Sequence, residues 1–393
     1  MPRFLLACIA LVAAAPAFAA VPLPPAPAVD AASYVLLDAQ SGQVLAQKDP
    51  DARRAPASTT KLMTAYVVFQ DLAAGHIKLD TQFTVSKKAW QQIGSRMFLK
   101  PGSQVSVDEL LQGMLVPSGN DAAMALAQGV AGTEAGFVTM MNADARALGM
   151  RNTHYANPTG LPDDGLYTSA ADLATLSRAL IRDYPQYYHY LGQKELTWNH
   201  ITQPNWNKLL WLDPSADGLK TGYTEDAGYC LAASAERKGQ RMIAVVMNVP
   251  QKSKTDNMAN YQHLAQVSES LLDYGMRFFG TRKLYDGDAR LGEARVWKGG
   301  RELVAVGPAQ PLYVTAPVGE LPGVKVETHL QARVPAPVAK GETVGEVTAS
   351  YGGQTLVAAP LVALRAVPAG GVWPKIRDTV LGWVRATGIG ARL

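Results

Sequence analysis

Runs of apolar residues divide the first 280 positions into strands and helices. A β-hairpin is predicted where Ser33–Asp38 and Gln43–Ala46 flank a turn at Ser41-Gly42. Apolar residues at helical spacing predict four helices: Ser58–Leu72, Asp108–Leu115, Asp121–Val130 and Ala170–Arg182. Three strands and a closing helix follow, at Gly218–Thr224, Gly228–Ala235, Arg241–Val249 and Val267–Phe279. Helices gathered between an early hairpin and late strands indicate an α+β domain, an antiparallel sheet with a helical cluster.

The pattern changes near Arg282. Strand-like segments such as Val324–Leu330 are separated by glycine-containing turns at 298–300, 340–342 and 351–353, and no helical pattern is visible up to Leu364. We therefore expect a second, all-β domain over residues 282–366, a small sandwich.

The last segment, Val372–Arg392, has the pattern of an amphipathic helix. One face carries apolar residues: Trp373, Ile376, Val380, Trp383 and Val384. The other carries Lys375, Asp378, Gly382 and Arg385. Two tryptophans with basic residues are typical of a helix that lies in a membrane surface. The alternative is a helix docked on the protein's own core. The Pro/Gly-containing stretch Val367–Gly371 favours the membrane, because it would detach the helix, so residues 367–393 are predicted to form a linker and an anchor.

The first 19 residues have the pattern of a secretory signal peptide. Arg3 precedes an apolar run, Phe4–Ala15, which is followed by Pro16 and the small-residue site Ala17-Phe18-Ala19. About twelve apolar residues are too few for a membrane span, which needs about 20. Cleavage would leave a first domain over residues 20–281 and one cysteine, Cys230, so no internal disulfide is expected.

The composition is that of a globular protein, with 48% apolar and 18% charged residues in a chain of 393. The net charge of +4 is mild and dispersed, which argues against nucleic acid as a partner. The six histidines are scattered, and neither C-x-x-C nor HExxH occurs. We therefore expect no metal site and no cofactor.

The first chemical signal is Ser58-Thr-Thr-Lys61. Residues three apart share one face of a helix, so Lys61 should lie beside Ser58. A serine hydroxyl becomes an effective nucleophile when a base takes its proton. Lysine can be that base if burial or a neighbouring cation lowers its pKa. A lone match is weak evidence, because a helix cap followed by a surface lysine has the same spacing.

The second signal is Ser118-Gly-Asn120, on a loop between two predicted helices. At such a position a serine can relay a proton, and a side-chain amide can form a hydrogen bond with a peptide. Tyr155-Ala-Asn157 is a competing match to a Y-x-N pattern. We prefer the Ser118 loop because Tyr155 runs into the turn Asn157-Pro158.

The third signal is Lys220-Thr221-Gly222, within a predicted strand. A lysine and a threonine hydroxyl can hold a carboxylate, and glycine lets a ligand approach the backbone. An extended peptide can add alongside such a strand. Lys220 would also be the second cation that lowers the pKa of Lys61.

In this order the three motifs resemble the penicilloyl-serine transferases, which comprise penicillin-binding proteins and serine β-lactamases. The chain is further similar to D-alanyl-D-alanine carboxypeptidases of the low-molecular-mass penicillin-binding protein 5/6 type. The similar stretches are 34–42, 57–63, 117–122, 157–161, 217–222, 227–229 and 274–279. The resemblance implies a β-lactamase-like transpeptidase domain followed by the all-β domain and the terminal helix.

The same resemblance implies a serine peptidase that removes the terminal D-alanine from peptidoglycan pentapeptides through an acyl-serine intermediate. Its partners would be peptidoglycan stem peptides, β-lactam antibiotics and, through the C-terminal helix, a membrane surface. It would be periplasmic and peripherally anchored to the inner membrane. The implied roles are nucleophile for Ser58, base for Lys61, proton relay for Ser118, substrate amide contact for Asn120, and carboxylate binding for Lys220 and Thr221 beside Gly222. The backbone N–H groups of Ser58 and Tyr223 would form the oxyanion hole.

Some alternatives stay open at this level. Tyr223 stands where close relatives often have histidine. The segment Gln251–His263 contains no arginine that could bind the substrate carboxylate, and Lys252 or Lys254 is the substitute that the sequence offers. A DD-endopeptidase and a serine β-lactamase are rival activities, and a non-catalytic wall-binding or membrane scaffold is a rival class. Glu195-Leu-Thr-Trp-Asn199 comes nearest to the deacylating E-x-x-L-N motif of class A β-lactamases but lacks its leucine.

Overall fold

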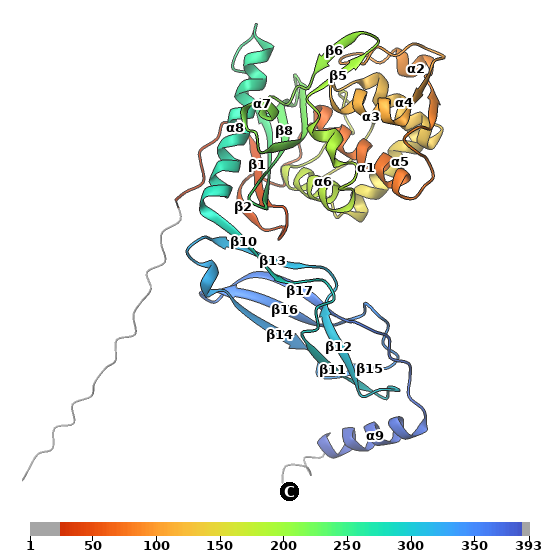
Figure 1. Cartoon of the computed structure of the whole chain (residues 1–393), viewed down its shortest axis with the longest axis vertical. Coiled ribbons are helices and arrows are strands. Elements are labelled where there is room, and N and C mark those ends of the chain that lie inside the picture. Colours follow the sequence, from red (N-terminus) through yellow and green to blue (C-terminus); the bar gives the residue numbers. More distant parts are fainter. Residues whose placement is uncertain (1–23, 387–393) are drawn as a thin grey trace, which may run out of the picture.

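The computed structural model describes residues 24–386, so the predicted signal peptide lies outside the described residues. Figure 1 shows a mixed helix-and-sheet part above an all-β part, with the long helix α8 (Asn257–Phe278) along one side of the upper part. This arrangement confirms the predicted α+β fold, with a C-terminal all-β region and a final helix.

A five-stranded antiparallel sheet forms the centre of the upper part. Its order is β2-β1-β9-β8-β7. The strands are β1 (Ser33–Asp38), β2 (Val44–Lys48), β7 (Ala216–Thr224), β8 (Gly228–Arg237) and β9 (Gln240–Val249). The predicted hairpin and the three late strands are thus confirmed. Because alternate residues of a strand face opposite sides, Leu36 packs toward α8 while Val35 packs toward the helical cluster.

The helical cluster covers the other face of the sheet. It consists of α1 (Lys61–Ala73), α2 (Lys87–Trp90), α3 (Val107–Leu115), α4 (Asn120–Ala131), α5 (Glu134–Ala147) and α6 (Ala170–Asp183). Smaller elements are η1 (Ala57–Thr60), η2 (Tyr188–Gly192), α7 (Leu209–Leu212) and two hairpins, β3–β4 (Gln82–Thr84, Gln104–Ser106) and β5–β6 (Glu195–Trp198, Ile201–Pro204). A capping box at Ser106 and Glu109 starts α3 at the predicted place.

Two helix boundaries differ from the prediction. The segment predicted as one helix from Ser58 begins as the 3₁₀ turn η1, and the α-helix starts at Lys61. Ala57 has a φ of 47°, so the chain enters this turn in a left-handed conformation that no α-helix allows. α8 begins ten residues before Val267, where Asp256 accepts a hydrogen bond from the Ala259 N–H as its N-cap.

The all-β part contains a two-stranded and a six-stranded sheet, with orders β10-β13 and β14-β16-β17-β12-β11-β15. Its strands are β10 (Phe279–Tyr285), β11 (Gly292–Trp297), β12 (Leu303–Pro308), β13 (Leu312–Pro317), β14 (Lys325–Leu330), β15 (Val334–Pro335), β16 (Thr343–Tyr351) and β17 (Gln354–Ala363), with the turn η3 (Leu321–Gly323). β10 follows α8 directly. The buried Asp38 carboxylate joins the two parts by accepting hydrogen bonds from Ser41 and Thr281.

The final helix, α9 (Val372–Ala386), is attached to the β part. The predicted detachment by Val367–Gly371 is wrong, because Val367 is buried and bridges to Val338, and Gly370 donates to Lys298 O at 2.7 Å. The Asp378 side chain, only 1% exposed, accepts the backbone N–H of Lys298 at 2.5 Å. Asp378 of the predicted polar face thus docks on the protein, whereas Lys375 of that face is exposed.

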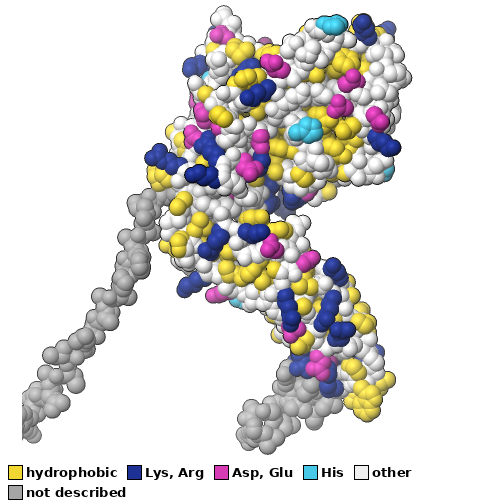
Figure 2. Space-filling model, viewed as in Figure 1, with side chains coloured by type: hydrophobic (Ala, Val, Ile, Leu, Met, Phe, Trp, Pro, Cys, Tyr) yellow, Lys and Arg dark blue, Asp and Glu magenta, His cyan; other side chains and the backbone are white. Residues whose placement is uncertain are grey.

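The apolar side of α9 faces solvent where its side chains are described. Trp373 is 81% exposed and Ile376 50% exposed. Figure 2 shows a hydrophobic group at the far end of the β part, where α9 begins. Val380, Trp383 and Val384, assigned to the same face, lie outside the residues whose side chains are described. Between residues 24 and 386, no helix combines the length and apolarity needed to cross a membrane.

Candidate active site

A cavity of about 210 Å³ lies between η1, the loop that precedes α4, and the edge strand β7. It brings together segments that are as far apart in the chain as Ser58 and Tyr261. Its lining residues are Ser58, Gly94, Ser95, Ser118, Asn120, Thr159, Gly160, Leu161, Trp206, Thr221, Gly222, Tyr223, Thr224, Asn257 and Tyr261. Members of all three sequence motifs therefore meet at one cleft.

Lys61 lies beneath Ser58 at the start of α1. Its Nζ atom is 2.8 Å from Ser58 Oγ, 2.7 Å from Asn120 Oδ1 and 2.7 Å from the carbonyl oxygen of Thr159. The expected pairing of Ser58 and Lys61 is present, but η1 rather than an α-helix provides it. The Lys61 side chain is fully buried.

Burial lowers the pKa of Lys61 well below its ordinary value of 10.5. The nearby Lys220 ammonium lowers it further, while the Asp121 carboxylate opposes the shift. Burial also lowers the pKa of Lys220, to about 7. The predicted influence of Lys220 on Lys61 is therefore present, with burial as the larger cause.

The Ser118 loop enters the cleft as expected. Ser118 has a φ of 67°, a conformation that costs a non-glycine residue about 1 kcal/mol or more. Its buried Oγ has no hydrogen-bond partner among the described residues. Asn120 Oδ1 accepts a hydrogen bond from Lys61 Nζ, and Asn120 Nδ2 donates a hydrogen bond to Ile93 O at 2.7 Å. One Nδ2 proton of Asn120 is left for another acceptor.

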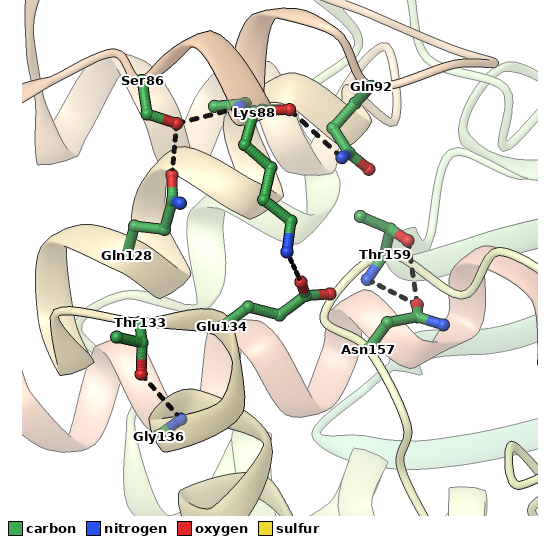
Figure 3. A network of polar contacts seen from close by, with 10 residues as sticks. Ser86, Lys88, Gln92, Gln128, Thr133, Glu134, Gly136, Asn157 and Thr159 are labelled. Carbon is green, nitrogen blue, oxygen red and sulfur yellow. Dashed lines mark hydrogen bonds and ion pairs between the residues drawn. The ribbon is translucent and has the colours of Figure 1, made fainter.

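The competing motif at Tyr155 does not line the cleft. Tyr155 is fully buried in the helical core, whereas Asn157 shapes the neighbouring turn. Asn157 Oδ1 accepts from Thr159 N, Thr159 Oγ1 and Gly160 N, and Figure 3 shows the two Thr159 bonds. This turn delivers the Thr159 carbonyl to Lys61. Sequence reasoning missed that role, although the Asn157-Pro158 turn signal was visible.

The K-T-G motif lies on β7, at the edge of the sheet. Lys220 is buried and donates to Thr221 O at 3.1 Å, while Thr221, Gly222 and Tyr223 line the cleft. A Cβ atom at Gly222 would lie 2.9 Å from Ser58 N and 3.0 Å from Pro56 O and Thr59 N. Glycine thus lets β7 approach the backbone of the nucleophile turn.

We expect Gly222→Ala to lower kcat for peptide cleavage by about 100-fold, because the added methyl group pushes the Ser58 amide out of place. Overpacking against backbone should also cost about 1–3 kcal/mol of unfolding free energy. Steady-state kinetics and urea unfolding measure both effects. Gly292→Ala in β11 is the control, because its nearest contact would be Val306 Cγ2 at 3.9 Å. Wild-type kinetics in Gly222→Ala would show that this close approach has no role.

Several predicted or alternative residues lie away from the cleft. Glu195 lines a separate groove with Lys208 and Trp211. Neither Lys252 nor Lys254 lines the cleft, whereas Asn257 and Tyr261 of α8 do. In residues 24–386, no group of three or more His, Cys, Asp or Glu side chains could hold a metal ion.

Comparison with known proteins agrees with this geometry. The sequence model of the family described as D-alanyl-D-alanine carboxypeptidase, peptidase S11, matches residues 20–251. The model of the penicillin-binding protein 5 C-terminal domain matches residues 279–369. The D-alanyl-D-alanine carboxypeptidase DacC of Escherichia coli is 41% identical over 93% of this chain and 91% of its own length. DacF of Bacillus subtilis is 33% identical over 91% and 90%.

Solved structures show the same fold. Penicillin-binding protein 5 of Haemophilus influenzae superimposes with a TM-score of 0.79 at 37% identity, covering 88% of this chain and 99% of that one. Penicillin-binding protein 6B of Escherichia coli gives 0.69 at 36% identity, covering 87% and 98%. The fold and site thus define a serine peptidase of the penicillin-binding class. Within that class, the chain belongs to the D-alanyl-D-alanine carboxypeptidase family and is a serine-type D-Ala-D-Ala carboxypeptidase.

Proposed function

We propose that this enzyme removes the terminal D-alanine from peptidoglycan pentapeptides by transient acylation of Ser58, with Lys61 as its base. The set of acceptors around Lys61 Nζ carries the proposal. A neutral amine has two protons and one lone pair. Asn120 Oδ1 and Thr159 O can only accept, so they take the two protons and direct the lone pair at the Ser58 hydroxyl.

In the proposed acylation, Lys61 takes the Ser58 proton while Oγ attacks the carbonyl carbon between the two D-alanines. The developing oxyanion is bound by backbone N–H groups of Ser58 and Tyr223. The C–N bond then breaks. The proton passes from Lys61 through the Ser118 hydroxyl to the leaving amine, and Ser118 Oγ has no competing partner among the described residues. Water then hydrolyses the ester and regenerates Ser58.

The peptide would lie along the free edge of β7, as an added strand. Its terminal carboxylate would be bound by the Thr221 hydroxyl and the Lys220 ammonium, while Asn120 contacts the substrate amide through its remaining Nδ2 proton. D-alanine release from a purified pentapeptide tests the function directly. Release of a cross-linked dipeptide without free D-alanine would instead favour an endopeptidase.

We also propose that the protein is exported by its N-terminal signal and held at the inner membrane through α9. Two observations support this location: Trp373 and Ile376 are exposed, and Asp378 docks on the β part, which leaves these apolar residues facing outward. A helix with an outward apolar side and lysine beside it suits the headgroup region of a bilayer. The enzyme would then be periplasmic and peripheral.

Truncation before Val372 is expected to release the protein from membranes without loss of activity on small peptides. The removed helix contacts the β part and lies at the opposite end of the molecule from α1 and α4 in Figure 1. Sedimentation with phospholipid vesicles and D-alanine release measure the two properties. Trp373→Asp with Ile376→Asp should also weaken vesicle binding, whereas Thr379→Ala, on an exposed but polar position, should not. Sedimentation of the truncated enzyme with vesicles would place the anchor elsewhere.

A further inference from the structure

The first turn of α8 stands at the edge of the cleft. Its first residue, Asn257, and Tyr261 both line the cavity. Asp256 fixes this turn by accepting from Ala259 N at 3.0 Å. The Asn257 side chain is exposed, so it can present either its oxygen or its nitrogen to a ligand. A chain of hydrogen bonds decides which one.

The chain starts at the buried Asn260. Its Oδ1 accepts the backbone N–H groups of Lys252 at 2.9 Å and Ser253 at 2.8 Å, which only an oxygen can do. Asn260 Nδ2 therefore lies at the other end of the amide. It donates to Ser253 O at 2.8 Å and to the Tyr229 hydroxyl at 3.0 Å.

The Tyr229 hydroxyl links Asn260 to Asn257 and thereby fixes the orientation of the Asn257 amide. It has one proton, and since it accepts from Asn260, that proton is free to be donated to Asn257 Oδ1 at 2.7 Å. Burial raises the pKa of Tyr229, which keeps the proton in place. Asn257 Oδ1 is thus turned inward. Nδ2 is the other end of an amide that lines the cavity, and it has no acceptor among the described residues.

The orientation of β7 indicates which cleft residue lies on the same side as Asn257. Thr221 and Tyr223 pair across β7–β8 with Leu231 and Tyr229, which belong to the core beneath α8. The Thr221 hydroxyl and Asn257 Nδ2 therefore approach the cleft from the same side of the edge strand.

We infer that Asn257 Nδ2 donates a hydrogen bond to the terminal carboxylate of the peptide, beside Thr221, and that Tyr229 is the positioning residue for this amide. The inference rests on the proposed peptidase function. On the α8 side, the carboxylate would be bound by a neutral amide, which offers a directed hydrogen bond and no positive charge. Replacement by a carboxylate would oppose the substrate charge directly.

The test is steady-state cleavage of a pentapeptide by Asn257→Ala, Tyr229→Phe and the double variant. We expect Asn257→Ala to raise KM about tenfold with little change in kcat, as for a lost hydrogen bond to a charged group. Asn257→Asp should raise KM further. Tyr229→Phe keeps the ring stacked on Tyr223 and should raise KM about threefold. The double variant should be no worse than Asn257→Ala, since Tyr229 acts through Asn257.

Gln262→Ala, an amide on α8 that lines the neighbouring groove, is the matched control and should keep wild-type KM. A pentapeptide that ends in a carboxamide should be cleaved by wild type and by Asn257→Ala with the same kcat/KM, whether that value is high or low. An unchanged KM for Asn257→Ala in an active enzyme would overturn the inference, as would additive effects in the double variant. If the wild type released no D-alanine, the proposed function would fail instead. The rate of Ser58 acylation by penicillin, which also carries a carboxylate, would then decide the role of Asn257.

Discussion

Replacement of Lys61 by arginine is expected to reduce kcat/KM for D-alanine release by about 10³-fold, the scale of a lost general base. Arginine retains a long, charged side chain with hydrogen-bond donors, so the change tests basicity. Its guanidinium does not lose a proton in proteins, whereas burial and Lys220 lower the pKa of Lys61. Ser58→Ala should be at least as damaging, because the nucleophile is absent.

The pH profile of the wild type offers an independent measurement of this role. The base acts as a neutral amine, so kcat/KM should fall as the pH decreases through the lowered pKa of Lys61. Carboxylate binding needs a charged Lys220, whose pKa is lowered to about 7 by burial in the free enzyme. The alkaline limb should therefore lie below the ordinary lysine value of 10.5.

Circular dichroism and thermal unfolding of each variant separate loss of chemistry from loss of fold. Ser58→Ala removes only a hydroxyl and should unfold like wild type. Substantial turnover by a folded Lys61→Arg enzyme would contradict the assignment of Lys61 as base. The same conclusion would follow from a kcat/KM that does not change on the acid side.

Penicillin is expected to acylate Ser58 and to remain bound for much longer than one peptide turnover. Its amide presents a carbonyl and a carboxylate at a spacing similar to that of a D-Ala-D-Ala terminus, so the β7 side of the cleft should accept it. After ring opening, the leaving amine stays tethered to the adduct and obstructs approaching water. Rapid deacylation would then need a base placed for that water.

The described lining of the cleft offers no carboxylate for this purpose. Glu195, at the nearest match to a deacylating motif, lies in the separate groove beside Lys208. Lys61 is placed for acylation, because Asn120 Oδ1 and Thr159 O accept its two protons and its lone pair is directed at the Ser58 hydroxyl. Slow deacylation follows from this arrangement, and it separates the enzyme from a serine β-lactamase.

Intact-mass spectrometry after mixing with penicillin should reveal one persistent adduct, and digestion should localise it to the peptide that contains Ser58. Ser58→Ala is the control and should remain unmodified. Rapid hydrolysis of many equivalents of penicillin, with no adduct detected, would support the β-lactamase alternative and contradict the prediction.

Local patterns were sufficient for most of the catalytic framework. The strands Gly228–Ala235 and Arg241–Val249 were predicted nearly to their observed ends, because both are long apolar runs bounded by turn residues. The amide at Asn120 and the lysine at 220 could be selected because each stands in a short motif, and the order of three motifs is far more specific than any one of them.

Other features had no local signal. The contact of Lys61 with the Thr159 carbonyl involves a backbone group, which any residue type could supply. The helix α8 starts ten residues before the predicted position, because its first turn contains few apolar residues and is stabilised by the Asp256 cap and the buried Asn260. The linker at Val367 appeared free in sequence but pairs with Val338, a contact between distant segments.

The sequence by itself therefore determined the family, the helical and strand periodicities and the pairing of Ser58 with Lys61, since these depend on residues close together in the chain. Only the tertiary structure decided which groups surround those residues. The partners of Lys61 Nζ, Asn120 and Thr159, lie 59 and 98 residues away, and the partner of Asn257 Oδ1, Tyr229, lies 28 residues away. A sequence motif can identify the donor of a hydrogen bond. Because a hydrogen bond is directional, its acceptor and its angle are set by the folded structure.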